Sequence, residues 1–304
     1  MPTLEPIIRR ATPDDSQACF AVSWTSISDL AARTGNPWDG SADDHWPRFR
    51  DLYGLLADIA VEWWIAEDAS DHEIIGYARS VERGNDGGLF ELAELFVLPG
   101  RQSSGVGRTL LERAFPIGRG AVRVIVATAD LRAVARYHKA DTSIQFPILG
   151  MSGAPRADAD QAISLEPQRA TADDLAAIAV IERTVLEYER GERELRWLLD
   201  QREGYLYRHE GAVLGVAFIG MGGSGPIAAM DPAALPDMLS HVEARAAALG
   251  RSQVAFEVPS PNVTAIRHLL GRGFLLDPFV TYLMANRPFG KFDRFIGFSP
   301  PFVL

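Results

Sequence analysis

Glycines at a fixed spacing stand where an apolar segment gives way to a helical pattern. The apolar stretch 95–98 ends at Pro99, and a polar turn follows that carries Gln102, Gly105 and Gly107. Glycine lets a backbone turn tightly and approach a ligand closely, and the free N–H groups at the start of a helix favour anions. The segment therefore predicts a phosphate-binding turn, although a Gly-x-Gly alone fits an ordinary strand-to-helix connection equally well.

Hydrophobic periodicity predicts the elements that hold this turn in place. In the first half of the chain, helices are expected over 13–34, 44–60, 105–117 and 131–139, and strands over 62–68, 73–83, 88–98, 122–129 and 143–150. In the second half, helices are expected over 172–187, 191–201, 232–249 and 262–271, and strands over 204–209, 212–220, 225–230 and 253–258.

The chain also contains an internal repeat. The segment RATPDD at 10–15 recurs as RATADD at 169–174, and each copy follows a short apolar segment (6–8 or 163–165) that is expected to be a strand. Thr12 and Thr171 are predicted helix N-caps with acidic residues in the first turn. A repeat this far apart indicates duplicated domains, which we expect at 1–152 and 163–304, joined by a small, polar linker at 153–162.

The string from Gln102 to Gly107 resembles the acetyl-CoA pyrophosphate loop of the GNAT N-acetyltransferase superfamily, Gln/Arg-x-x-Gly-x-Gly/Ala directly after an apolar strand. The element order of both halves is that of the GNAT fold, so the resemblance covers nearly the whole chain. It implies an α/β fold class with two tandem GNAT-like domains, each a mixed, mostly antiparallel α+β sheet flanked by helices. The two-domain plan is similar to that of mycothiol synthase, whose C-terminal copy is the catalytic one.

The resemblance implies which residues of the first half would bind acetyl-CoA. They come from the end of the strand, the turn and the start of the helix: Leu95, Phe96, Val97, Gln102, Ser103, Ser104, Gly105, Val106, Gly107 and Arg108. Asp130 stands at the family's Asn/Asp position before the next helix. No metal is expected.

The corresponding segment of the second half, 231–238, contains no glycine and no basic residue, and it carries Asp231 and Asp237. Like charges there would oppose an anion. We therefore expect the N-terminal domain to bind acetyl-CoA and to be catalytic, and the C-terminal domain to be a degenerate copy.

Acetyl transfer to an amine needs a base, because an amine with a pKa of about 10 is an ammonium ion at neutral pH. Glu94 is the candidate general base and Glu91 a weaker one, with strand alternation placing them on opposite faces. The alternative for Glu94 is a strand glutamate paired with an arginine. By the resemblance, Tyr137 would be the general acid for the leaving thiolate, and its alternative is a core aromatic.

The acceptor is expected to lie against the first two helices and their loop. That region carries aromatic and acidic side chains, a combination that suits a cation or a solvated loop with packing tryptophans: Trp24, Trp38, Asp39, Asp43, Asp44 and Trp46. The apolar C-terminal tail, 292–304, is expected to dock on a domain, between the domains or on a second subunit.

Composition narrows the class of partner. The 304 residues carry 30 basic and 40 acidic side chains, a net charge of −10, which disfavours nucleic acid and favours a cationic partner such as an amine. No apolar run is long enough to span a membrane, no signal peptide is visible, and Cys19 is the only cysteine, expected in the core. We expect a cytoplasmic monomer or homodimer.

Together these features predict an acetyl-CoA-dependent N-acetyltransferase that acts on a primary amine of a small molecule by direct attack in a ternary complex. Two alternatives stay open. One is a non-catalytic CoA-binding sensor or interaction protein, and the other is an acyltransferase with another acyl donor or a protein acceptor. Fold alone does not decide among them.

Overall fold

The computed structural model describes residues 5–35, 37–84, 88–102, 105–160, 163–220 and 223–297. The chain divides into two compact units, Met1–Ser143 with Met284–Arg287 (unit 1) and Ile144–Leu283 with Pro288–Leu304 (unit 2). The predicted domains 1–152 and 163–304, with a linker at 153–162, stay a prediction. The two compact units are divided at a different position in the chain. The strand after Ser143 is counted with unit 2, and a short segment from near the C-terminus is counted with unit 1.

Unit 1 has the element order that the hydrophobic pattern predicts. Its elements are β1 (Ile7–Arg10), α1 (Ser16–Arg33), α2 (Ala42–Ile59), β2 (Ala60–Glu67), β3 (Ile74–Arg83), β4 (Leu89–Val97), α3 (Val106–Ala114), β5 (Val122–Thr128) and α4 (Leu131–Lys139).

The sheet of unit 1 has the order β1-β2-β3-β4-β5. Strands β1 to β4 pair antiparallel, whereas β4 and β5 pair parallel. At the other edge of β5 lies the end of β12 (Leu275–Ala285), where the N–H of Asn286 donates to the Arg123 carbonyl at 3.2 Å. The predicted mixed, mostly antiparallel α/β sheet is confirmed.

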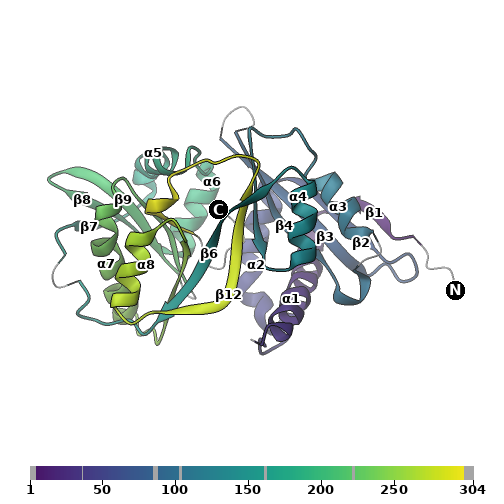
Figure 1. The fold of residues 1–304 in the computed structure, drawn as a ribbon, viewed down its shortest axis with the longest axis horizontal. Coiled ribbons are helices and arrows are strands. Elements are labelled where there is room, and N and C mark those ends of the chain that lie inside the picture. Colours follow the sequence, from purple (N-terminus) through teal and green to yellow (C-terminus); the bar gives the residue numbers. More distant parts are fainter. Residues whose placement is uncertain are drawn as a thin grey trace. The chain divides into compact units, whose positions relative to one another are not determined.

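Alternation along β3 separates the two faces of this sheet. Ser80 donates from its hydroxyl to the Ala114 carbonyl of α3 (2.6 Å), whereas Tyr77 points to the opposite face, where its hydroxyl lies 3.1 Å from that of Tyr53 on α2. Helices α3 and α4 lie side by side (Figure 1). The predicted core position of Cys19 on α1 is confirmed, since its side chain is fully buried with Phe20.

Unit 2 contains the following elements: β6 (Ser143–Gly153), β7 (Glu166–Arg169), α5 (Leu175–Leu186), α6 (Glu192–Gln201), β8 (Glu203–His209), β9 (Ala212–Ile219), β10 (Ser224–Ala229), α7 (Leu235–Ala248), β11 (Val254–Pro259), α8 (Val263–Gly271), most of β12, and β13 (Phe295–Ile296).

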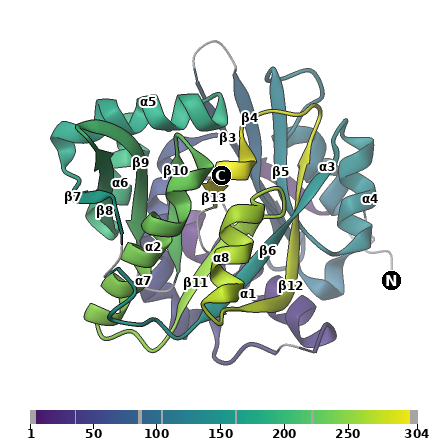
Figure 2. The same cartoon turned by 60° about the vertical axis from the view of Figure 1, so that its left-hand side comes forward.

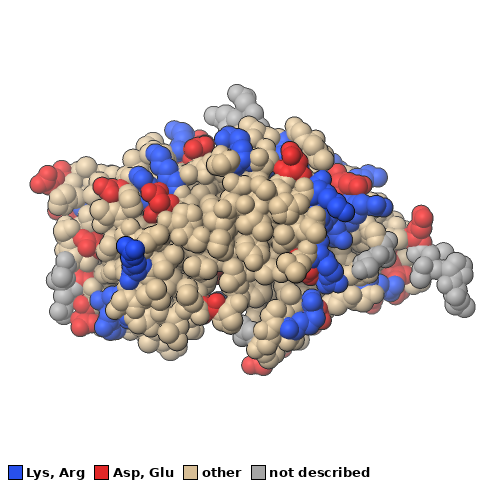
Figure 3. All heavy atoms as spheres, viewed as in Figure 1, with Lys and Arg blue, Asp and Glu red and all other residues tan. Residues whose placement is uncertain are grey.

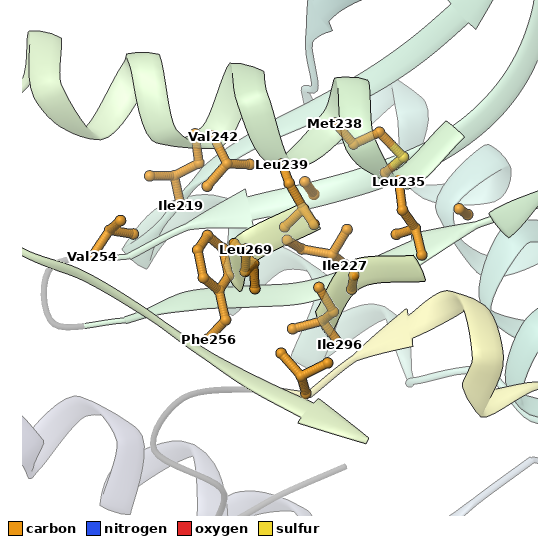
Figure 4. Packing of buried hydrophobic residues seen from close by; sticks show 14 of the residues in the cluster. Ile219, Ile227, Leu235, Met238, Leu239, Val242, Val254, Phe256, Leu269 and Ile296 are labelled. Atoms are coloured by element: carbon orange, nitrogen blue, oxygen red, sulfur yellow. The ribbon is translucent and has the colours of Figure 1, made fainter. Parts of the chain in front are cut away.

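The strands of unit 2 are ordered β12-β6-β11 and β13-β10-β9-β8-β7. Helices α7 and α8 lie next to each other and cover one face (Figure 2). The core beneath them is apolar and includes Leu235, Val242, Phe256 and Ile296, all of which are fully or almost fully buried (Figure 4).

The segment 163–165 is not a strand, which corrects the expectation for the second repeat. The strand β7 begins one residue later at Glu166 and pairs with β8. The N–H and the hydroxyl of Ser164 both donate to the carboxylate of Asp237 (2.7 and 2.8 Å), so this N–H does not take part in strand pairing. The N-caps are found as predicted, with Asp15 accepting from the Thr12 N–H and Asp174 from the Thr171 N–H.

The start of the apolar tail is docked. Strand β13 pairs antiparallel with β10 through Ile227 opposite Ile296 and Ala228 opposite Phe295. The residues after Gly297 lie outside the described part of the chain. Among the described residues, no helix combines the length and apolar character that a membrane span needs.

The burial of β13 predicts that Ile296→Ala destabilises unit 2. Removing a fully buried isoleucine side chain costs about 2–5 kcal/mol of unfolding free energy, because transfer and cavity terms add. Leu275→Ala, at a position with 71% exposure, is the matched control and should cost less than about 0.5 kcal/mol. Urea unfolding of both variants measures the difference, and equal stability would show that β13 is not part of the core.

Candidate active site

A β-bulge in β4 opens the sheet of unit 1. Arg79 lies opposite Glu94 and Ser80 opposite Leu92, so Ala93 is an extra residue on β4. The parallel pairing of β4 with β5 covers only Leu89–Leu92, although both strands continue beyond it. Because a bulge bends its strand and increases the local twist, the two strands separate from Ala93 onward.

The end of β4 presents its backbone to this split. The carbonyl of Val97 accepts hydrogen bonds from the Gln102 side-chain amide (3.0 Å) and the Ser26 hydroxyl (3.3 Å), so it points away from β3. The carbonyl of Phe96 points toward Gly76 of β3. Backbone groups alternate along a strand, and therefore Leu95 and Val97 face the split whereas Phe96 faces β3.

The predicted anion turn follows at the N-terminus of α3. Gly105 is its N-cap residue with φ +92°, a left-handed conformation that favours glycine, and a Cβ there would meet no atom within 4 Å. The helical bonds begin with the N–H groups of Arg108 and Thr109, which donate to the Gly105 carbonyl. The N–H groups of Val106 and Gly107 thus have no acceptor within the helix, and such groups at a helix N-terminus favour an anion.

Figure 3 shows basic side chains gathered on the face that α3 and α4 present. The side chain of Arg108 on α3 is exposed, and that of Val106 is buried, so Val106 can contribute only its backbone. Ser103 and Ser104, predicted to bind the cofactor, lie outside the described residues. Lysine and arginine beside a helix N-terminus extend its attraction for anions.

Glu94 lies in a buried polar network on the α1–α2 face. Its Oε1 accepts hydrogen bonds from the hydroxyls of Tyr53 (2.8 Å) and Tyr77 (2.7 Å), and its Oε2 lies 2.8 Å from Nη2 of Arg79. The side chains of Arg79 and Glu94 are 0% and 1% exposed. Burial and the charge of Glu94 raise the pKa of Tyr53 and of Tyr77 well above 10, so both hydroxyls stay protonated and keep donating.

The guanidinium of Arg79 is also enclosed by rings. Its Cζ lies 4.3 Å from the centre of the Trp63 ring and 5.1 Å from that of Tyr53. Desolvation opposes its charge, but Glu94 and the neighbouring groups raise the pKa of Arg79 above its usual range. The network is therefore a charged pair held in an aromatic setting, as cation–π contacts allow.

Glu91 does not lie on the opposite face from Glu94, which corrects the alternation argument. Glu91 is opposite Val81 and Glu94 is opposite Arg79, two odd-numbered residues of β3 that share a face. The extra residue in the bulge resets the alternation. Glu91 is fully buried and ion-paired with Arg83, so it makes a second buried pair in the same layer.

Asp130 precedes α4, and Tyr137 lies within its last turn. Burial raises the pKa of Tyr137 to about 12, which keeps its hydroxyl protonated at neutral pH. Asp130 caps α4 by accepting from the Arg132 N–H at 2.9 Å. Burial opposes the charge of Asp130, but its bonds from Arg132 prevail and lower the pKa of the carboxyl.

The aromatic side chains of α1, α2 and their loop come together as predicted. Trp24 stacks on His45 with ring centres 4.0 Å apart and contacts Trp38 at 5.4 Å, and Phe20 joins Trp46 at 5.5 Å. Trp38 is 39% exposed, so the cluster reaches the surface. Phe20 also contacts Tyr53 at 5.3 Å, which links the cluster to the network around Glu94.

The three acidic residues of this loop are exposed. Asp44 caps α2 by accepting from Ser41, and these hydrogen bonds lower the pKa of its carboxyl. Asp43 accepts from the Gln17 side chain at 3.5 Å. Asp44 is thus a helix cap, and Asp39 and Asp43 are the acids that stay available to a cationic ligand.

A comparison with family models gives one match for this region. Residues 24–141 match the acetyltransferase (GNAT) family. The matched segment lies within unit 1, and unit 2 lies outside it. The match spans the β4–β5 split, the anion turn and α4 of unit 1, which are the parts of the site described above. No curated protein sequence matches the chain.

Solved structures with the GNAT fold cover nearly the whole chain. A structure from Pyrococcus horikoshii with a provisional acetyltransferase name is 15% identical with a TM-score of 0.68, covering 97% of this chain and 94% of its own. A GCN5-related N-acetyltransferase from Sphaerobacter thermophilus is 17% identical with a TM-score of 0.62, and the match covers 93% of this chain and 96% of that protein's chain. A tandem GNAT protein from the clavulanic acid biosynthesis pathway is 16% identical with a TM-score of 0.56, and the match covers 93% of this chain and 99% of that protein's chain. These likenesses confirm a tandem GNAT fold, and the likeness to mycothiol synthase stays a prediction.

Unit 2 lacks the open split of unit 1. Between β10 and β11 lies β13, which pairs with β10, while the N–H of Gly297 donates to the Glu257 carbonyl of β11 at 2.8 Å. Asn262, which stands at the family's Asn/Asp position, donates from its side chain to the Phe295 carbonyl at 3.0 Å. The chain's own tail thus fills the space between β10 and β11.

Two further features separate unit 2 from unit 1. β10 contains no acidic residue at all, in contrast to β4 with its two glutamates. Asp231 caps the turn that follows β10 by accepting from the Ala233 N–H at 2.9 Å, so a carboxylate lies where unit 1 has its anion turn.

Sequence reasoning missed Tyr53, Tyr77, Arg79 and Arg136, a residue of α4 that lies against Gly107. A signal was available for the β3 pair, since an arginine within an apolar strand, two residues from a tyrosine, needs a buried partner. The sequence gives no local signal for Tyr53 and Arg136, because each contacts residues on elements that are far apart in the chain.

The carboxyl of Glu257 on β11 provides a test of how unit 2 is packed. Burial, and then the charge of Asp277, raise the pKa of Glu257 to about 7. The native state therefore holds a proton between pH 4.5 and 7 that the unfolded state releases, and stability falls as the pH rises through this window.

We expect Glu257→Gln to remove this part of the pH dependence. The variant should exceed the wild type by about 2–3 kcal/mol above pH 7 and match it near pH 4. Urea unfolding at several pH values measures the difference. A constant gap across pH 4–8 would show that Glu257 is ionised throughout and that its environment is not as described.

Proposed function

We propose that this GNAT protein transfers an acetyl group from acetyl-CoA to a primary amine of a small molecule, in a ternary complex formed by unit 1. The observation that carries the proposal is the contrast between the units. Unit 1 has a β4–β5 split followed by an uncovered anion turn, whereas the split of unit 2 is filled by β13. The buried Cys19 and the single-cysteine composition support a cytoplasmic setting.

The residues of unit 1 fit the acyl-CoA substrate. N–H groups of Val106 and Gly107 would bind its diphosphate, with Arg108 nearby. Leu95 and Val97 would pair with the pantetheine arm through their backbones. Gln102, by its bond to the Val97 carbonyl, would hold the turn in position. Asp130 would orient α4 through its cap.

The reaction balances with the groups present in unit 1. The neutral amine attacks the thioester carbon, a C–N bond forms, the C–S bond breaks, and the leaving thiolate takes the proton of Tyr137. The backbone N–H groups of the split would polarise the carbonyl. The ammonium ion loses one proton to become the attacking amine, and the nitrogen loses a second as the amide forms. We assign the first proton to Glu94, and the second restores the hydroxyl of Tyr137.

The burial and hydrogen bonds of Glu94 limit how the first proton could reach it. Its side chain is buried and its oxygens already bind Tyr53, Tyr77 and Arg79, so an amine does not reach it directly. Tyr53 and Tyr77 are buried as well, so we propose a relay in which a water molecule takes the amine proton and a tyrosine hydroxyl passes a proton from that water to Glu94. The acceptor would lie along the aromatic cluster around Trp24 and Trp38, with Asp39 and Asp43 attracting its charge.

The same network favours one alternative. A carboxylate held by an arginine and two tyrosines is also what a purely structural pair needs, and this supports the hypothesis of a CoA-binding sensor without turnover. An acyltransferase with another acyl donor or a protein acceptor would use the same split. The experiments below separate these cases.

The function is tested by release of free thiol from acetyl-CoA against a panel of amines. We expect turnover with one class of amine, and we expect Gly105→Glu to weaken acetyl-CoA binding by about 100-fold or more, because it puts a carboxylate into the anion site. Gly118→Glu is the matched control, since Gly118 also has a positive φ (+88°) and open space at its Cβ. Binding without turnover on any amine would favour the sensor, and binding that survives Gly105→Glu would contradict the assigned site.

The role of Glu94 is tested by Glu94→Gln beside Glu182→Gln. Each change breaks a buried glutamate–arginine pair, with Arg79 or with Arg190, and each should cost about 3–5 kcal/mol of stability. Only Glu94→Gln should lower kcat, by about 100-fold or more, when both proteins are assayed folded at low temperature. Equal kcat values for the two variants would assign Glu94 a structural role alone.

A further inference from the structure

Arg136 lies against the first turn of α3. A Cβ on Gly107 would come within 2.6 Å of Nη1 of Arg136, so the guanidinium occupies the space that a side chain at position 107 would need. Gly107 is the second residue of α3, one of the two whose N–H groups have no acceptor in the helix. The guanidinium and these N–H groups therefore belong to the same small region.

The surroundings of Arg136 differ from those of the other basic residues nearby. Arg132 on the same helix is bonded to Asp130, Arg33 is bonded to Asp29, and Arg113 lies over the Trp64 ring at 5.0 Å. Within the described residues, no carboxylate or carbonyl accepts a hydrogen bond from the half-buried guanidinium of Arg136. The guanidinium and the N–H groups at the start of α3 thus place two sets of donors beside each other, an arrangement that favours an anion.

We propose that Arg136 binds the diphosphate of the acyl-CoA substrate together with the N–H groups of Val106 and Gly107. This inference rests on the proposed function and adds to it a side chain that the anion turn itself does not contain. Arginine suits the role, since its planar fork donates to two oxygens of a phosphate at once. Gly107 then has a second role: it leaves room for the guanidinium.

The role of Gly107 makes the proposal testable in two ways. Arg136→Leu removes the guanidinium, and Gly107→Ala displaces it while leaving it present, since the colliding atoms are the far end of a flexible side chain. If both act through one contact, their effects on the affinity for acetyl-CoA do not add in the double variant. Additive effects would mean that Gly107 and Arg136 act separately.

Calorimetric titration of the full chain tests the assignment. We expect Arg136→Leu to weaken acetyl-CoA binding about 10- to 100-fold and Arg136→Lys to recover part of the loss. Lys139→Leu, the same change of charge at an exposed position of α4, is the control and should keep the wild-type affinity. Thermal unfolding of each variant confirms that it is folded.

Three ligands identify the phosphate. The loss should be equal for acetyl-CoA and its 3′-dephospho form, and absent for S-acetyl-N-acetylcysteamine, which has no phosphate. A loss confined to acetyl-CoA would transfer Arg136 to the 3′-phosphate and overturn the diphosphate assignment. An unchanged affinity in Arg136→Leu overturns the inference alone, whereas a wild type that binds no acetyl-CoA overturns the proposed function as well.

Discussion

The bulge at Ala93 is the constraint on which the site of unit 1 depends. One extra residue in β4 ends the pairing with β5 after Leu92 and separates the two strands. The same residue turns Glu94 to the face that already carries Glu91. Without it the sheet would close, and Glu94 would point toward α3 rather than toward Tyr53 and Tyr77.

The two buried ion pairs show what this geometry requires. Arg79–Glu94 and Arg83–Glu91 lie in one layer between the sheet and helices α1 and α2. A buried pair stabilises a fold little compared with apolar residues of the same size, because desolvation offsets the attraction. Hydrogen bonds from two tyrosines to Glu94 satisfy one of its oxygens and hold the carboxylate in a single orientation. Such a group is positioned for a task, and the relay through the tyrosines is the task we assign to it.

The two units differ in one respect that decides their chemistry. In unit 1 the pairing of β4 with β5 ends at Leu92, and the helix that follows begins after Gly105 with two N–H groups that have no acceptor in the helix. In unit 2 the equivalent space is taken by Phe295 and Ile296, and the side chain of Ile296 belongs to the core (Figure 4). The tail thus contributes to the core of unit 2 and fills the space between β10 and β11.

Local patterns predicted much of this. The order of helices and strands, the glycine turn at Gly105, the caps at Thr12 and Thr171 and the buried Cys19 all follow from residues that are neighbours in sequence or share one helix face. The prediction that Glu91 and Glu94 lie on opposite faces was wrong, because alternation assumes an unbroken strand and no residue type marks Ala93 as a bulge. The assignment of β6 to unit 2, the docking of β13 between β10 and β11, and the contact of Arg136 with Gly107 depend on segments far apart in the chain.

The central claim, that unit 1 alone binds acyl-CoA, is tested most directly by the stoichiometry of acetyl-CoA binding. Titration calorimetry of the full chain should give one site per chain. Two equivalent sites would contradict the claim, because the tail of unit 2 would then not occupy its split. The absence of any site would contradict the assignment of the anion turn in unit 1.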